Sequence, residues 1–343
     1  MMPLMRTAGL PIRMVAFFLS LLFAGGLSAQ KHKDQMVKPI AGPRATALRV
    51  TWLYVSPDKT SQKLERVQIG REMVIAERSA PWVRVFANTD IEEVHNQADE
   101  PEIGDEATPP ISGWVEARGI VDEKTPNGDQ VIMGEAENQE ALASDPRGPA
   151  NAAQSARLLY RRVAEMFTSS PLAAEAAWRA ADIQWQIQKA DAASRPSAKE
   201  RDPYMRDLMD EDEMKKVIKF FPSTPEAEMA AFEMLDNKMC GDWQGQEKCP
   251  EREAEVYEKY AAEHPAGPRT AMALYDAAYR QCVLADMFHA DNNDKKADEA
   301  KARAHDLAAR LRDKFPQSDY TARATALVFK IDQNIPVYGI DQQ

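Results

Sequence analysis

Thiols and imidazoles are the side chains of this chain that could carry covalent chemistry. A thiolate activated by a neighbouring imidazole is a nucleophile that many peptidases use. Six residues in the second half of the chain could contribute to such a pair: Cys240, Cys249, Cys282, His264, His289 and His305. Cys282 falls on an apolar, alanine-rich helical stripe, where burial disfavours the thiolate. His264 occupies a position that phenylalanine holds in related segments. We therefore expect no enzyme.

The three cysteines allow three disulfide pairings. Cys240 and Cys249 are nine positions apart and flank a loop-like segment around Trp243, so we expect these two to form a disulfide. Closing so short a loop stabilises a fold by about 2–3 kcal/mol in the chain-entropy model. Cys282 is then expected to be a buried thiol that behaves as a small hydrophobic side chain.

Clustered oxygen ligands are the second chemical possibility, because calcium prefers several carboxylates. The run Asp286, Asp291, Asn293 and Asp294 suggests such a site, but lysines at 295 and 296 replace a ligand and a glycine of the calcium loop. Segment 88–111 has eight acidic residues and no Lys or Arg, which predicts a mobile loop, with a calcium site as the alternative. The chain has no phosphate-binding glycine loop and no zinc motif. We expect no metal and no cofactor.

The first 29 residues have the pattern of a secretory signal peptide. Arg6 and Arg13 flank a short positive segment, Met14 to Leu27 is almost wholly apolar, and Ala29 ends a small-residue exit. An apolar stretch of this length spans only about 21 Å of helix, too short to cross a membrane. We expect cleavage after Ala29, a linker over 30–44, no transmembrane segment in the mature protein, and a periplasmic or secreted location.

Charge and composition describe an ordinary folded protein. The 343 residues carry a net charge of −11, with 44% apolar and 28% charged residues. This length is enough for about two domains. An acidic chain repels phosphate backbones, and the sequence reveals no basic patch that would reverse this, so no nucleic-acid partner is expected.

Residues 45–123 are rich in β-branched and aliphatic types separated by turn residues, which predicts several short strands. Trp52 and Tyr54 alternate with aliphatic neighbours, so their rings should project together away from the core. They form our candidate ligand surface. The alternative is that the helical half of the chain covers them. Trp82 and Trp114 are expected in the core.

Four short motifs follow one another in this region: Leu53-Tyr54-Val55, Gly70 to Ile75, Trp82 to Val85, and Gly113-Trp114-Val115. In this order they resemble bacterial Src-homology-3-like domains. The resemblance implies a small β-barrel over 45–123 and a binding role toward cell-wall peptides or a partner protein. The sequence departs from the family at Tyr54 and Ser56, where the family has Asn and Arg, and in the insertion 88–111.

The second half of the chain changes character. Residues 124–150 have the composition of a linker, with room for one extra turn or strand at its start. Beyond them apolar residues recur at spacings of three and four, which predicts eight helices in four hairpins over 151–335, followed by a tail, 336–343. In each hairpin a large side chain closes the first helix and a turn segment, rich in proline, follows. The joint residues are Phe167, Phe221, His264 and Phe315.

The last joint, Phe315 to Ala322, nearly matches an aromatic-Pro-x-Ser-x-x-Ala pattern. This pattern resembles the tetratricopeptide repeats of bacterial envelope proteins, especially the outer-membrane-assembly and cell-division coordinator types. The resemblance implies a helical solenoid that binds proteins. Successive joints are 54, 43 and 51 residues apart, whereas the family repeat has about 34. We therefore expect an irregular superhelix and assume no continuous peptide groove.

Together these patterns predict a multidomain β + α protein, in which a small β-barrel precedes an α-helical hairpin-repeat solenoid. We expect a non-enzymatic adaptor of the bacterial cell envelope. Its barrel would bind a wall fragment, such as peptidoglycan, or a protein, and its repeats would bind envelope proteins. The alternative is a cell-wall hydrolase or a direct regulator of one.

Overall fold

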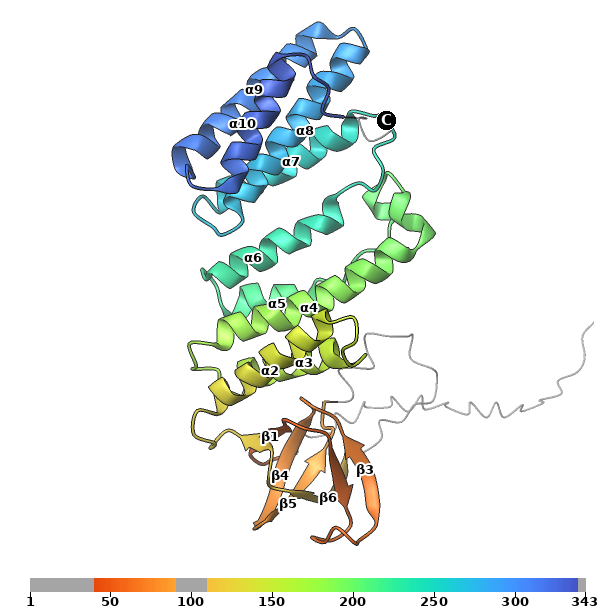
Figure 1. Cartoon of the computed structure of the whole chain (residues 1–343), viewed down its shortest axis with the longest axis vertical. Coiled ribbons are helices and arrows are strands. Elements are labelled where there is room, and N and C mark those ends of the chain that lie inside the picture. The colour runs from red at the N-terminus through yellow and green to blue at the C-terminus, as the bar shows by residue number, and fades with distance from the viewer. Residues whose placement is uncertain (1–39, 91–109, 339–343) are drawn as a thin grey trace, which may run out of the picture. The chain divides into compact units, whose positions relative to one another are not determined.

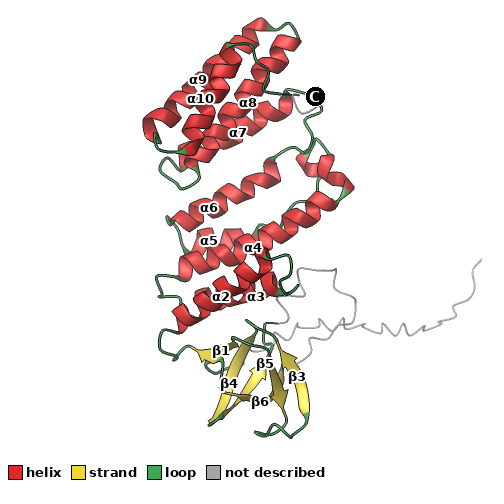
Figure 2. Cartoon of the chain, viewed as in Figure 1, coloured by secondary structure: helices red, strands yellow, loops and turns green. Residues whose placement is uncertain are grey.

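The computed structural model of the chain describes residues 40–90 and 110–338. An antiparallel sheet comes first along the chain and a series of α-helices follows (Figure 1; elements coloured by type in Figure 2). The expected signal peptide (1–29), most of the linker 30–44 and the acidic residues 91–109 lie outside the described residues. None of the helices within these described ranges combines the length and the hydrophobicity that a membrane-spanning segment needs.

Seven strands form the sheet; burial alternates along β2 and β6, whereas β1 and β4 have runs of consecutive buried residues. The strands are β1 (Arg44–Ala47), β2 (Thr51–Tyr54), β3 (Lys63–Val67), β4 (Glu72–Ser79), β5 (Trp82–Ala87), β6 (Ile111–Glu116) and β7 (Ile120–Asp122). Their order is β3-β2-β6-β5-β4-β1-β7, and β3 is not paired with β7 among the described residues. The predicted β region is confirmed, but the sheet is open rather than a clearly closed small barrel.

Residues 124–150, for which the sequence predicts a linker, contain a helix, α2 (Gly128–Ser144). The linker prediction is wrong. Ile132, Met133 and Ala136 are buried on one side of α2, where they join the apolar core around the next helix. This stripe is short and lies among Gly, Asn, Glu and Ser residues, so the polar composition concealed the helical spacing.

Four helix pairs follow α2. They are α3 (Ala152–Met166) with α4 (Ala173–Ser194), α5 (Asp212–Phe220) with α6 (Pro225–Glu233), α7 (Lys248–Glu263) with α8 (Thr270–Ala290), and α9 (Asp294–Lys314) with α10 (Asp319–Asp332). Short 3₁₀ helices, η1 (Pro196–Lys199), η2 (Pro203–Met205) and η3 (Met234–Lys238), lie in the connections after α4 and α6. The four predicted hairpins are therefore present, and α2 raises the number of described α-helices to nine.

An apolar junction connects the sheet to the first two helices. Val121 of β7 is buried in the same cluster as Leu159 and Val163 of α3 and the apolar stripe of α2. Gly70, in the turn before β4, lies against α3 so closely that a Cβ atom there would stand 2.7 Å from Cβ of Leu158. Val121 at one end of the sheet thus packs into the apolar cluster of α2 and α3, which is separate from the core between the strands.

A buried ionic cluster lies at the same junction. Arg162 of α3 reaches the carboxylates of Glu72 on β4 (2.7 Å), Asp90 after β5 (3.3 Å) and Glu165 on its own helix (3.0 Å). We call these four residues the Arg162 cluster. Asp90 is the third residue of the insertion 88–111, and both it and Asn88 are buried. The prediction of a mobile loop is wrong for these first residues, because an arginine distant in sequence holds Asp90.

Candidate functional site

Trp52 and Tyr54, the predicted ligand surface, lie on β2. Their strand neighbours Thr51 and Leu53 are buried. Since successive side chains of a strand point to opposite sides, the two rings lie on the side of the sheet away from its apolar core. Trp52 is 40% exposed and Tyr54 is half-buried, so in the described part of the chain the helices do not cover Trp52.

Other aromatic rings continue this surface across neighbouring strands. Strand register places Tyr54 opposite Trp114 of β6, and Trp114 opposite Arg84 of β5. Trp114 was expected in the core but is half-buried in this outward row. Trp82 was also expected in the core; it is buried, but outside the apolar core of the sheet, and its ring meets the Tyr54 ring edge to face at a centroid distance of 5.5 Å. Aromatic residues of β2, β5 and β6 are therefore neighbours in the sheet, and the rings of Tyr54 and Trp82 are in contact.

Cationic side chains surround these rings. The ammonium of Lys63 lies 4.9 Å from the centre of the Trp52 ring, a cation–π contact. Arg66 of β3 is directly opposite Trp52. Among residues 40–90 and 110–338, Lys63, Arg66 and Arg84 have no ion pair with a carboxylate. We define the outer face as this set of rings and cations: Trp52, Tyr54, Lys63, Arg66, Trp82, Arg84 and Trp114.

The carboxylate of Glu116 borders the outer face, and nearby cations already neutralise it. Its oxygens lie 2.7 Å from the Lys59 ammonium and 3.5 Å from the Arg49 guanidinium. The hydrogen bond from Lys59 lowers the pKa of Glu116 against the opposing effect of desolvation. Glu116 therefore stays ionised at neutral pH without making the outer face negative.

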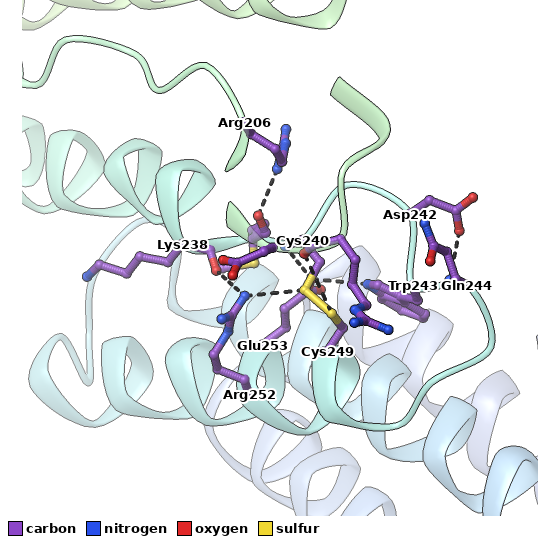
Figure 3. Close-up of a disulfide and its surroundings, with 12 residues drawn as sticks. Arg206, Lys238, Cys240, Asp242, Trp243, Gln244, Cys249, Arg252 and Glu253 are labelled. Carbon is purple, nitrogen blue, oxygen red and sulfur yellow. Dashed lines mark hydrogen bonds between the residues drawn. A yellow bond between two sulfur atoms is a disulfide. The ribbon is translucent and has the colours of Figure 1, made fainter. Parts of the chain in front are cut away.

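The predicted disulfide between Cys240 and Cys249 is confirmed (Figure 3). It closes the loop that leads into α7. The buried carboxylate of Glu253, one turn into α7, accepts hydrogen bonds from the backbone N–H of Cys240 (2.9 Å) and the indole N–H of Trp243 (3.1 Å). Outside the loop, Arg206 donates to the carbonyl oxygen of Met239 (2.7 Å). The loop is thus fixed by a covalent bond and by hydrogen bonds from both sides.

Arg280 of α8 connects this loop to the aromatic residues behind it. Its guanidinium donates to Glu253 (3.0 Å) and lies 5.8 Å from the centre of the Trp243 ring and 4.6 Å from that of Tyr257. The Trp243 ring also meets Tyr338, within the expected C-terminal tail, at 5.8 Å. Because Arg280 is engaged by a carboxylate and by rings, we assign it a structural role.

The four predicted joint residues occupy equivalent positions in the fold. Phe167, Phe221, His264 and Phe315 directly follow α3, α5, α7 and α9, with φ between −122° and −130° and ψ between 52° and 63°. The ninth residue after each joint is a fully buried alanine: Ala176, Ala230, Ala273 and Ala324. His264 packs its ring 4.6 Å from Tyr260 and lies 3.5 Å from a Glu228 oxygen, consistent with a packing role. The sequence repeat therefore has a structural counterpart.

The candidate nucleophile, Cys282, is fully buried on α8. Burial raises the pKa of its thiol to about 12, and the carboxylates of Asp286 and Asp332 act in the same direction. His305 lies 2.8 Å from Asp332 and is exposed. Over the described ranges, no three or more His, Cys, Asp and Glu side chains are grouped so that they could hold a metal ion. The arrangement does not favour thiolate chemistry at Cys282.

No local pattern in the sequence predicted the Arg162 cluster or gathered the cations of the outer face. Arg162 is 90 residues from Glu72 and 72 from Asp90, so no spacing rule connects them. Arg84 did carry a signal, because it lies between two valines in a strand pattern and must point away from the core.

No family model and no curated protein matches the chain. Among solved structures, the designed helical repeat protein DHR64 shares 14% identity over 60% of this chain and 94% of its own, with a TM-score of 0.23. The chain of the DHF79 filament shares 16% identity over 58% of this chain and 95% of its own, with a TM-score of 0.21. TM-scores this low carry no argument about the fold or the function of this chain.

Proposed function

We propose that this chain is a secreted or periplasmic, non-enzymatic adaptor of the bacterial cell envelope. Its sheet, as a Src-homology-3-like module, binds a wall fragment or a protein on the outer face. Its helical hairpins, as tetratricopeptide-like repeats, bind protein partners. The observation that carries the proposal is the outer face, where Trp52 remains exposed beside Tyr54 and Trp114 while the other side of the sheet forms the core.

The disulfide supports the proposed compartment. Such bonds persist in oxidising spaces and are rare in the cytosol. Cys240 and Cys249 are bonded to one another, and their loop is buried at both ends. A secretory signal peptide over residues 1–29 would deliver the chain to such a space.

A second exposed surface supports binding by the helical half. Between α4 and α5, η2 and the residues after it present three apolar side chains to solvent: Tyr204 (86% exposed), Met205 (66%) and Leu208 (54%). The segment is nevertheless fixed, since Asp202 accepts a hydrogen bond from the backbone N–H of Tyr204 and Pro203 is buried. Neighbouring apolar side chains held at the surface are typical of sites where proteins meet.

The adaptor function can be tested with the full-length protein as bait in an envelope extract of the organism that encodes it. Retained proteins are quantified by mass spectrometry for the wild type, for Tyr204→Ser with Leu208→Ser, and for Lys216→Gln, an exposed control on α5. We expect specific proteins to be lost with the double substitution and kept with the control. Identical retention by all three baits would contradict partner binding at this segment.

The hydrolase alternative predicts a different result. Incubation with purified peptidoglycan sacculi would release muropeptides, and the release would disappear on Cys282→Ser. We expect no release, because Cys282 is buried and its pKa is raised far above neutrality. Release that depends on Cys282 would replace the adaptor proposal with an enzyme.

A further inference from the structure

The charge on and around the outer face is opposite in sign to that of the whole protein. Five cationic side chains lie on it or at its border: Arg49, Lys59, Lys63, Arg66 and Arg84. Three carboxylates belong to the same surface: Asp58, Glu77 and Glu116. The chain as a whole has a net charge of −11. The sequence revealed no basic patch because the contributing strands and turns are spread over residues 49–84.

Three of these cations are available to a ligand. Glu116 engages Arg49 and Lys59, whereas in the described part of the chain Lys63, Arg66 and Arg84 have no carboxylate ion pair. Glu77 is the cross-strand neighbour of Arg84, but no salt bridge joins them. Free guanidinium and ammonium groups beside rings can bind a carboxylate while the rings pack against apolar surface.

We infer that the outer face binds an acidic glycan, a chain of sugar rings that carries carboxylate groups. Apolar faces of sugar rings would pack on Trp52 and Trp114, and carboxylates would accept hydrogen bonds from Arg66, Arg84 and Lys63. This inference rests on the proposed function of the sheet as a ligand-binding module and specifies the chemistry of its ligand.

Two observations favour a glycan over a nucleic acid, which also combines rings with negative charge. The acidic body of the protein repels a long phosphate backbone beyond the limited area of the outer face. The disulfide is typical of proteins in an oxidising compartment outside the cytosol, which agrees with the proposed secreted or periplasmic location. A short carboxylated oligosaccharide needs only the few cations that the outer face provides.

Isothermal titration of the full-length protein with tetragalacturonate tests the inference. Its fully methyl-esterified form is the matched control, because it keeps the rings and removes the charges. We expect the acid form to bind at least about tenfold more tightly than the ester, and its binding to weaken as salt shortens the screening length. Equal affinities for the two forms, or no binding of the acid form, would overturn the inference.

Variants then locate the site. Lys63→Gln combined with Arg84→Gln should weaken binding of tetragalacturonate by about tenfold, since each exposed charge contact contributes about threefold to the affinity. Lys216→Gln on α5 should leave the affinity unchanged. An equal effect of the control and the double variant would place binding elsewhere and overturn the inference. Tighter binding of an oligothymidylate with equal charge would overturn it in favour of a nucleic acid.

The titration and the extract experiment can succeed or fail independently of one another. Titration uses a purified sugar, whereas the extract experiment measures protein retention through the segment around Tyr204. If titration fails while that retention persists, the glycan inference falls and the adaptor stands. If titration succeeds while retention is absent, the glycan inference stands and the helical binding role falls. The comparison of the acid and ester forms uses the wild-type protein, so this test remains valid even if the substituted variants fail to fold.

Discussion

Replacing Arg162 with methionine tests whether the sheet and α3 are held together by buried charge. The Arg162 side chain is 1% exposed and lies against three carboxylates, of which those of Glu72 and Asp90 are 7% and 2% exposed. Methionine keeps much of the length and volume but removes the charge and the donors. The substitution therefore leaves buried carboxylates with fewer partners without creating a large cavity.

The expected loss follows from what remains around those carboxylates. Removing one partner of a buried ion pair costs about 3–5 kcal/mol. Here Arg44 still lies 3.0 Å from Glu72, and Arg71 lies 3.1 Å from Asp90. Because each carboxylate keeps one cation, we expect the lower end, about 3 kcal/mol of unfolding free energy.

The loss should also depend on pH. Burial alone would raise the pKa of Glu165, but the charges of Arg162 and Arg161 outweigh burial and lower it. A carboxyl whose pKa is lowered by folding contributes stability above its unfolded pKa, and loses that contribution as pH falls through its folded pKa. The share of the Arg162→Met stability loss that comes from Glu165 should therefore have its full size at pH 7 and become smaller below about pH 4.5.

Urea unfolding followed by far-UV circular dichroism measures these quantities. Arg312→Met is the matched control, because Arg312 is 69% exposed and lies 3.7 Å from Asp313, so its loss should cost less than about 1 kcal/mol. Adding Glu72→Gln to Arg162→Met should recover part of the stability by removing one buried charge. A loss no larger than that of the control, or no recovery in the double variant, would refute the argument that this cluster holds the junction.

Three further outcomes follow from the described contacts. Replacing Cys240 and Cys249 by serine should lower the unfolding free energy by about 2–3 kcal/mol, and reduction of the wild type should reproduce that loss in a thermal melt. Burial raises the pKa of Asp276 to about 6, so the folded state binds the carboxyl proton more tightly than the unfolded chain does. The unfolding free energy should therefore fall as pH rises from about 4 to 6. Asp276→Asn should abolish that loss and stabilise the protein by about 2 kcal/mol at pH 7 in urea titrations. Gly70→Ala should cost about 2–3 kcal/mol by the same measurement, because φ is +81° and the new methyl group would meet Leu158.

Local patterns in the sequence predicted much of the helical half. The joint residues Phe167, Phe221, His264 and Phe315 all end a helix with similar backbone angles, because a large side chain followed by a turn segment is a local signal. The disulfide was also predictable, since a nine-residue separation around a loop leaves few alternatives. Helix α2 was missed because its apolar stripe of Ile132, Met133 and Ala136 is short and its flanks resemble a linker.

The candidate site was predictable only in part. Alternation along β2 placed Trp52 and Tyr54 correctly on the outward side of the strand. The partners of these rings come from β3, β5 and β6, and only the strand register brings Arg66, Trp114 and Arg84 beside them. Register depends on pairing between distant strands, which a single sequence does not encode in any local spacing.

The Arg162 cluster also bears on how such a protein could be rearranged by recombination. A gene fragment that encoded the sheet alone would carry Glu72 and Asp90 but leave their arginine behind on α3. The transplanted sheet would then expose Val121 and present two carboxylates without that partner. A recombination crossover that preserves the fold would therefore have to fall after Arg162. The smallest segment that could be exchanged between genes then includes α2 and α3 as well as the seven strands.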